Sequence, residues 1–111
     1  MVASAVPRRG DVFLVSLEPT LGTEIRKTRP CLVISPDELN QHLRTVIVAP
    51  MTTGGHRYPF RVACRFQKRD GFVVLDQVRT VDSQRLVRRL GRVSSTALSS
   101  SLRILQEMFA K

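Results

Sequence analysis

Residues 22–35, GTEIRKTRPCLVIS, set a cluster of charged side chains directly before an apolar run. Arg29 stands at the junction, and Glu24 precedes it in the same loop. Thr52 and Thr53 follow a second apolar segment, TVIVAPM. An arginine guanidinium can donate paired hydrogen bonds to the oxygens of a phosphodiester, and a threonine hydroxyl can donate one more. These residue types therefore suit chemistry at a phosphate, with Glu24 available to accept a proton or to orient a neighbouring group.

This chemistry requires the two apolar segments to lie side by side. They cover residues 30–35 and 45–51 and are joined by the short connection PDELNQHLR, so an antiparallel pairing is expected. That pairing sets the start of the first strand beside the end of the second. Arg29 is therefore expected close to Thr52 and Thr53, with the preceding loop lying over them.

Three more apolar runs bounded by turn residues predict further strands, at residues 11–17, 60–66 and 72–81. In FRVACRF, the second of these runs, apolar residues recur at every other position, which is typical of a half-buried strand and places Phe60 on the core face. The dipeptide Asp70-Gly71 then predicts the turn of a hairpin. An antiparallel sheet is the expected framework.

Helical patterns are fewer. Short helical turns are expected at DSQRLVRR and at PDELNQHL, where Pro36 suits the first helical position. A longer helix is expected from about Thr96, because leucines recur there at helical spacing and a serine can cap its start. We therefore predict one mainly β (α+β) domain over residues 1–111. It would be a small, strongly bent antiparallel open barrel with short helices and a packed C-terminal helix, preceded by a flexible extension, residues 1–8.

The chain is strongly basic, with 18 basic and 9 acidic residues, a net charge of +9 and a sequence pI near 11.2. The part after Gly55 holds 12 of the basic and 4 of the acidic residues. Such an excess attracts a polyanion such as nucleic acid. Since the apolar runs are far too short to cross a bilayer, we expect a soluble, cytoplasmic protein without membrane contact.

Other catalytic arrangements find little support. His42 and His56 lie in expected loops without a nucleophile at a matching position, which argues against Ser-His or Cys-His catalysis. The aspartates are scattered over a turn, a strand and a strand end, which is a poor basis for a two-metal nuclease. Cys31 and Cys64 lie inside apolar segments without metal-ligand spacing, and we interpret them as structural thiols. No metal and no cofactor are expected.

Several segments together resemble a known family. RRGDVFLVSLEPTLGTEIRKTRPCLVIS, VIVAPMTT, YPFRV and DGFVVLDQVRTVD follow one another in this order. Their GDV start, PT-x-G-x-E loop, RP junction, P-x-TT end and DQV segment resemble the MazF/PemK (Kid) toxins of bacterial type II toxin-antitoxin systems. The resemblance runs from about Arg9 to the end of the chain and implies an SH3-like barrel.

The same resemblance implies an endoribonuclease that cuts single-stranded RNA at short sequences without a metal. The ribose 2′-hydroxyl would attack the adjacent phosphorus and leave a cyclic phosphate and a 5′-hydroxyl end. The family's catalytic positions fall here on Arg29, Thr52 and, from some members, Glu24. Kid-like members carry an arginine where Val74 stands, so the MazF version of the catalytic set fits better. Because an arginine stays protonated at any ordinary pH, Arg29 is assigned to charge stabilisation.

Binding partners follow from the same residues and from the resemblance. Asp76 and Gln77 can hydrogen-bond the edges of unpaired bases, and Tyr58 can stack on a base. The other side chains expected to bind RNA are Arg26, Lys27, Thr53, Arg57 and Arg79. The family also implies a homodimer that a cognate acidic antitoxin inhibits by competing with RNA.

Three alternative functions are open at this point. CcdB-type gyrase poisons resemble this fold but rely on a tryptophan near the C-terminus, and this chain has no tryptophan. A noncatalytic nucleic-acid-binding barrel is compatible with the charge. A purely structural or interaction module leaves the expected convergence of polar groups at Arg29 unexplained.

Overall fold

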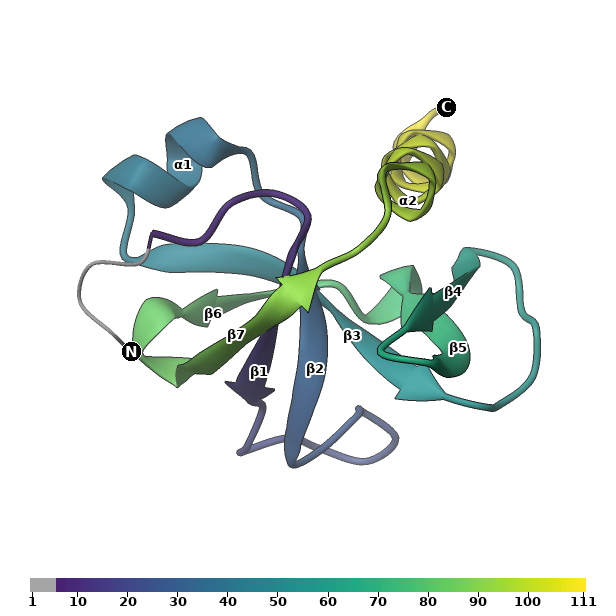
Figure 1. Ribbon diagram of the computed structural model, residues 1–111, viewed down its shortest axis with the longest axis horizontal. Helices are drawn as coiled ribbons and strands as arrows, with labels where there is room; N and C mark the ends of the chain where they lie inside the picture. The colour runs from purple at the N-terminus through teal and green to yellow at the C-terminus, as the bar shows by residue number, and fades with distance from the viewer. Residues whose placement is uncertain (1–5) are drawn as a thin grey trace.

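The computed structural model describes residues 6–111, and the first five residues of the predicted N-terminal extension lie outside this range. Seven strands and a long C-terminal helix make up most of the chain (Figure 1). The strands are β1 (Asp11–Ser16), β2 (Thr28–Val33), β3 (Thr45–Thr53), β4 (Arg61–Phe66), β5 (Arg69–Val74), β6 (Arg79–Asp82) and β7 (Leu86–Arg92). The helices are α1 (Asp37–His42), α2 (Ser95–Phe109) and the short 3-10 turns η1 (Leu75–Gln77) and η2 (Ser83–Arg85).

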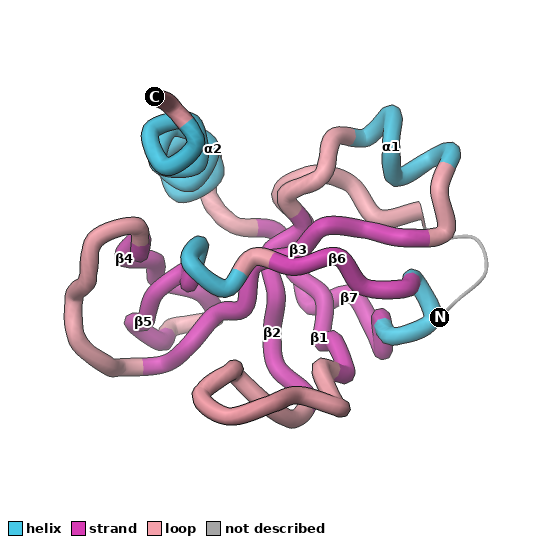
Figure 2. Tube along the Cα trace, turned by 180° about the vertical axis from the view of Figure 1, so that it is seen from behind, coloured by secondary structure: helices cyan, strands magenta, loops and turns pink. Residues whose placement is uncertain are grey.

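The strands form one antiparallel sheet in the order β4-β5-β3-β2-β1-β7. Strand β3 is the longest, and two strands, β6 and β5, pair with it one after the other along its length. Its first half pairs with β6 and its last three residues pair with β5. The sheet therefore bends along β3, and the β4–β5 hairpin lies to one side of the other strands (Figures 1 and 2). The predicted mainly β architecture with antiparallel strands, short helices and a packed C-terminal helix is confirmed.

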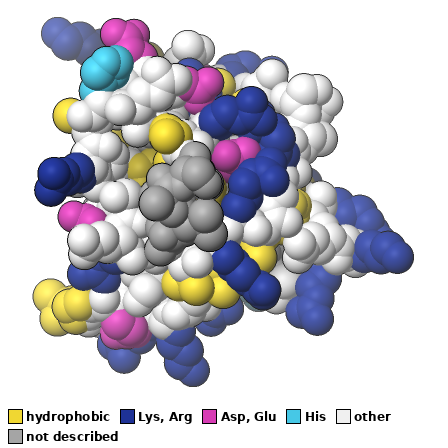
Figure 3. Space-filling view, turned by 60° about the vertical axis from the view of Figure 1, so that its left-hand side comes forward, with side chains coloured by type: hydrophobic (Ala, Val, Ile, Leu, Met, Phe, Trp, Pro, Cys, Tyr) yellow, Lys and Arg dark blue, Asp and Glu magenta, His cyan; other side chains and the backbone are white. Residues whose placement is uncertain are grey.

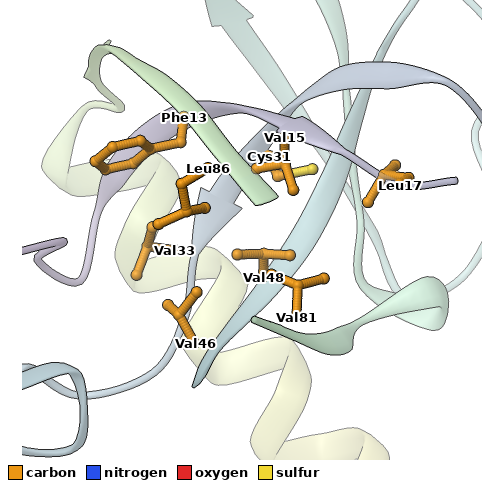
Figure 4. Packing of buried hydrophobic residues seen from close by; sticks show 9 residues of the cluster. All are labelled: Phe13, Val15, Leu17, Cys31, Val33, Val46, Val48, Val81 and Leu86. Atoms are coloured by element: carbon orange, nitrogen blue, oxygen red, sulfur yellow. The ribbon is translucent and has the colours of Figure 1, made fainter. Parts of the chain in front are cut away.

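Alternate residues of the central strands bury their side chains on opposite faces, because successive side chains of a strand point to opposite sides. One face carries Phe13, Val15, Cys31 and Val33, which meet side chains from β3, β6 and β7 inside the bend (Figure 4). The other face carries Val12 and Leu32 and packs against the β4–β5 hairpin and α2; α2 contributes Leu102, Ile104, Leu105 and Met108. The Ser94 side chain caps the start of α2 by accepting from Ala97 N–H at 3.1 Å. The sheet is thus held rigid from both faces.

The pairing of β2 with β3 is short, and this opens the end of the sheet. It runs from Val33 and Val48 to Cys31 and Pro50, although both strands continue further. Pro30 and Pro50 have no backbone N–H to donate, which limits the ladder at this point. Beyond it, β2 stays with β1, whereas β3 turns to pair with β5. The two strand ends therefore separate and leave a space between them.

The β4–β5 hairpin differs from the prediction. Its turn consists of Gln67 and Lys68, with φ of 51° and 65°, and not of Asp70-Gly71. Gly71 lies within β5 opposite Thr53, where a Cβ atom would come within 1.7 Å of the Thr52 carbonyl oxygen. The glycine is needed for this close approach of two backbones and not for a turn.

Other boundaries also correct the sequence analysis. The single strand expected over residues 72–81 is broken by η1, and the helix expected at DSQRLVRR is reduced to η2 and followed by β7. Pro36 is the N-cap of α1 and not its first helical residue. Phe60 precedes β4 with φ of 64° and is 41% exposed, so its expected place in the core is wrong. The C-terminal helix begins at Ser95, one residue from the expected start.

The N-terminal segment is tied to the sheet through Asp11. This carboxylate is 2% exposed and accepts a hydrogen bond from Arg8 N–H at 2.9 Å. It also pairs with Arg92 at 2.8 Å and with Arg89 at 3.3 Å, which links β1 to β7. The helices within residues 6–111 are too short or too polar to cross a membrane.

Candidate functional site

A cavity of about 370 Å³ fills the space where β2 and β3 separate. Arg29 and Pro30 line it from β2, and Met51, Thr52 and Thr53 line it from β3. Its other wall is the β4–β5 hairpin, which contributes Cys64, Phe66, Gln67, Arg69 and Phe72. We call it the arginine cavity because, within residues 6–111, its charged lining side chains are Arg29 and Arg69. The structure thus brings together Arg29, Thr52 and Thr53, the cluster predicted from strand pairing.

The polar groups of this cavity are available to a ligand. Arg29 is exposed, and its Nε donates to the Arg26 carbonyl at 3.3 Å. That bond fixes the stem and leaves the terminal guanidinium nitrogens without a partner among residues 6–111. The hydroxyls of Thr52 and Thr53 are likewise unbonded within the described part of the chain. A guanidinium and two hydroxyl donors without an acid among them form a site for an anion.

A second cavity has a volume of about 550 Å³. It is lined by Pro50 of β3, by residues 23–25 of the β1–β2 loop and by residues 76–79. We call it the carboxylate cavity, because Glu24 and Asp76 both line it, together with Arg79. The Gln77 side-chain oxygen accepts from Ile25 N–H at 2.8 Å and so attaches the loop to η1. The two cavities are neighbours, since consecutive residues of β3 line them in turn.

The predicted set of catalytic residues is divided between these cavities. Glu24 lines the carboxylate cavity, where its carboxylate accepts from Leu21 N–H within its own loop. Arg29 and Thr52 line the arginine cavity. Val74, which stands at the arginine position of Kid-like proteins, is fully buried. A guanidinium at that position would need a different surrounding core.

Asp76 is held by a neighbouring arginine. Arg61 makes a two-pronged contact with its carboxylate, at 2.9 Å from Nε and 3.0 Å from the second nitrogen. This hydrogen bonding lowers the pKa of Asp76 and raises the pKa of Arg61. The guanidinium carbon of Arg61 lies 4.9 Å from the centre of the Tyr58 ring, and His56 meets that ring edge-on at 6.5 Å. Asp76 is thus an ionised hydrogen-bond acceptor with a fixed orientation.

Of the remaining residues predicted to bind RNA, only Arg79 lines a cavity among residues 6–111. Arg26 donates to the Gly22 carbonyl at 3.2 Å, and Arg79 donates to the Leu17 carbonyl at 3.2 Å. Lys27 adopts φ of 68°, and its backbone N–H donates to the Glu18 carboxylate at 2.9 Å. Its side chain is exposed. Arg57 and Tyr58 lie in the exposed β3–β4 loop and line neither cavity.

Arg69 is the cavity residue that the sequence analysis missed. The sequence predicts the hairpin turn at Asp70-Gly71, and a turn assignment gives no orientation for the side chain of Arg69 beside it. The alternation of Val62, Cys64 and Phe66 extends across the actual turn, because Phe66 pairs with Arg69. Placing the turn at Gln67 and Lys68 would have directed Arg69 to the same face as those apolar residues. The Asp-Gly dipeptide was the stronger turn signal and concealed this pattern.

Neither cysteine is a strong nucleophile in this environment. Burial raises the pKa of Cys31 to about 12, and burial also raises the pKa of Cys64, which is only half-buried in the wall of the arginine cavity. Both thiols are free. Among residues 6–111, no three His, Cys, Asp or Glu side chains are grouped closely enough to hold a metal ion. On the face shown in Figure 3, basic side chains are widely distributed, with a few acidic side chains between them.

Comparison with known proteins identifies relatives over nearly the whole chain. Residues 8–109 match the family described as PemK-like, MazF-like toxin of type II toxin-antitoxin system. The endoribonuclease toxin MazF of Escherichia coli strain K12 is 38% identical over 81 residues, which cover 73% of this chain and 73% of that protein. MazF from Deinococcus radiodurans superimposes with a TM-score of 0.83 at 25% identity, over 94% of this chain and 96% of that one. A mycobacterial endoribonuclease in complex with its cognate antitoxin gives 0.76 at 24% identity, over 91% and 92%.

Proposed function

We propose that this chain, which belongs to the PemK-like, MazF-like toxins of type II toxin-antitoxin systems, is an endoribonuclease that a cognate antitoxin neutralises. Its substrate is single-stranded RNA, cut at a short sequence. The observation that carries the proposal is the arginine cavity, in which Arg29 and the two threonine hydroxyls converge without an acid. The family match favours this activity over gyrase poisoning, and a cleavage assay distinguishes it from noncatalytic nucleic-acid binding.

The scissile phosphate binds in the arginine cavity, where Arg29 donates to its non-bridging oxygens and Thr52 donates one more hydrogen bond. The ribose 2′-hydroxyl loses its proton as its oxygen attacks the phosphorus, and the bond to the 5′-oxygen of the next nucleotide breaks. The leaving 5′-oxygen takes a proton from water, so the products are a 2′,3′-cyclic phosphate and a 5′-hydroxyl. Negative charge grows on the phosphate oxygens as this happens. Arg29 stabilises that charge because a fixed guanidinium does not have to reorganise as water would. No metal is required for these roles.

Glu24 and the residues beside it handle the nucleoside next to that phosphate. Glu24 orients the ribose or accepts the 2′-hydroxyl proton from the neighbouring cavity. Asp76 accepts hydrogen bonds from a base, and Gln77 offers its side-chain N–H groups, since its oxygen is already bonded to Ile25. Acceptors and donors at defined positions select among unpaired bases. Sequence preference therefore resides in the carboxylate cavity, and the scissile phosphate reacts in the arginine cavity.

Cleavage of one long, unstructured RNA in excess EDTA tests this function. The fragments are mapped, and their ends are assayed for a cyclic phosphate and a 5′-hydroxyl. We expect cutting at a short recurring sequence that chelation does not reduce. Cutting that is lost in EDTA and restored by magnesium would contradict the metal-free chemistry, and an absence of cutting would contradict the activity.

The partner is a small acidic antitoxin that binds a homodimer of this chain. Its attraction comes from the +9 charge, and the exposed cations Arg26, Lys27 and Arg29 lie where RNA and an acidic tail would compete. Expression of the toxin alone should arrest growth, and co-expression of the acidic protein should relieve the arrest. A monomer in light scattering at micromolar concentration, or a neutralising protein that leaves RNA cleavage intact, would contradict this arrangement.

A further inference from the structure

Arg69 is the second cation of the arginine cavity, and nothing in the proposed catalytic set uses it. It begins β5 directly after the hairpin turn and is exposed. Most other arginines of the neighbouring strands are occupied: Arg61 pairs with Asp76, Arg65 pairs with Asp70 at 3.0 Å, and Arg79 donates to a carbonyl. Within residues 6–111 the Arg69 guanidinium has no ion pair and no hydrogen bond.

The backbone holds Arg69 at a defined distance from the threonines. Thr53 pairs with Gly71, and Gly54 N–H donates to the Asp70 carbonyl at 3.0 Å, so the contact of β3 with β5 continues almost to Arg69. The close approach that Gly71 allows keeps the two strands in this register. Thr52 pairs with Phe72, so Arg69 lies three residues, or roughly 10 Å along the strand, beyond the level of Thr52. The long arginine side chain lets its guanidinium reach from there toward a phosphate next to the one at Thr52.

We propose that Arg69 binds the RNA phosphate adjacent to the scissile one, so that the arginine cavity holds two consecutive phosphates. The inference rests on the proposed function and adds a substrate-positioning contact to it. Arg29 and Thr52 bind the reacting phosphate, whereas Arg69 holds its neighbour on the side of the β4–β5 hairpin. Asp70 does not compete for Arg69, because it is paired with Arg65. Arg69 therefore contributes to binding and register, and Arg29 to the chemical step.

The test compares Arg69→Gln with Lys68→Gln. Lys68 is adjacent, carries the same charge and is exposed, but it does not line the cavity. Binding is measured to an RNA 12-mer made uncleavable by 2′-O-methyl groups, over a range of salt concentrations. For single-stranded RNA, the loss of one phosphate contact makes the plot of log binding constant against log salt concentration less steep by about 0.7. We expect this reduction and about tenfold weaker binding at low salt for Arg69→Gln, and near wild-type values for Lys68→Gln.

Cleavage kinetics give the second measurement. Arg69→Gln should raise KM about tenfold with kcat within a factor of about two, and Arg69→Lys should restore most of the salt slope because it keeps the charge. Replacing single phosphates of the 12-mer by uncharged methylphosphonates should weaken wild-type binding at the neighbouring position and leave Arg69→Gln unaffected there. Equal behaviour of Arg69→Gln and Lys68→Gln, or a loss confined to kcat, would overturn the assignment. These outcomes differ from failure of the proposed function, in which the wild-type protein itself would not cut.

Discussion

Arg29 on β2 and Thr52 on β3 each lie two residues beyond Cys31 and Pro50, where the pairing of these strands ends, and both line the same cavity. Both residues therefore lie beyond the β2–β3 pairing, but each is still held in a strand. Their neighbours in the sheet, Val15 opposite Arg29 and Phe72 opposite Thr52, hold them from the outer sides. If this pair is catalytic as proposed, its rigid placement keeps the two side chains at a fixed separation and leaves room for a phosphate.

Replacing Arg29 should abolish cleavage and leave the fold unchanged. Removing one fixed donor to a developing oxyanion costs a factor of about 100 to 1,000 in kcat, and we expect at least this loss for Arg29→Ala. Arg29→Lys should also be strongly impaired, because it keeps the charge but loses the planar fork. Since Arg29 is exposed, the melting temperature should change by no more than about 2 °C. Arg44→Ala, which removes an exposed arginine from the other end of the sheet, is the control. Near-normal cutting by Arg29→Ala would remove this residue from the site.

Gly71→Ala should disturb the site through the backbone. The added Cβ would meet the Thr52 carbonyl oxygen at 1.7 Å, so β3 and β5 must move apart. We expect the free energy of unfolding to fall by about 2 kcal/mol and the melting temperature by roughly 10 °C. Cleavage should fall even at temperatures where the variant is folded, because Thr52 is displaced. Ala63→Ser, an exposed change opposite Phe72 on β4, should alter stability by less than about 0.5 kcal/mol. Equal stability of the two variants would show that the strands are not in close contact.

The Arg61–Asp76 pair should give a pH-dependent contribution to stability. Because Arg61 lowers the pKa of Asp76, the pair stabilises the fold fully above the ordinary carboxyl value of 3.8 and loses this effect as pH falls through the lowered value. The melting temperature of Arg61→Gln should thus be below wild type at pH 7 and converge with it in strong acid. The pair is partly exposed, so the corresponding difference in the free energy of unfolding should not exceed about 1 kcal/mol. Arg65→Gln, which breaks a more exposed pair, serves as the control and should have no measurable effect. A difference in melting temperature between wild type and Arg61→Gln that does not shrink in strong acid would contradict this account.

The two thiols should differ in reactivity. Cys31 is fully buried with a pKa of about 12, whereas Cys64 is half-buried in the arginine cavity. Iodoacetamide at pH 8 should therefore modify Cys64 slowly and Cys31 only after unfolding, as mass spectrometry would show. An uncleavable 2′-O-methyl RNA should protect Cys64 if phosphate and ribose fill the cavity. Modification of Cys31 at the same rate, or no protection by RNA, would contradict the assignment of the cavity.

Strand pairing could be predicted from the sequence because it depends on short, strongly apolar runs. The meeting of Arg29 with Thr52 follows from one antiparallel connection and required no side-chain detail. The residues from Leu75 to Gln77 could not be assigned in this way, because an apolar run does not reveal where a buried strand changes into a 3-10 turn. The η1 turn is determined by tertiary packing, since Leu75 is fully buried in the core on the face of the sheet that carries Val12 and Leu32.

The hairpin wall of the site could not be predicted for a different reason. Left-handed backbone at Gln67 and Lys68 is unfavourable for residues other than glycine, so local propensity favours Asp70-Gly71 as the turn. The close contact of Gly71 with Thr52 is a property of two strands far apart in the sequence. Only this contact shows why the glycine is placed in the strand, and it directs Arg69 to the arginine cavity. The placement of Glu24 and Arg29 in two different cavities is likewise a property of the folded sheet.

We propose that this protein cuts RNA through the 2′-hydroxyl next to a phosphate held by Arg29 and Thr52. The most direct measurement uses two oligoribonucleotides that contain the mapped cut site and differ only by a single 2′-deoxy substitution at the attacking nucleotide. Both are incubated with the protein in excess EDTA, and the products are resolved by mass spectrometry. We predict a cyclic phosphate and a 5′-hydroxyl from the all-RNA oligomer and no cleavage at that position of the substituted one. Cleavage of the 2′-deoxy oligomer, or products that carry a 5′-phosphate, would contradict the account.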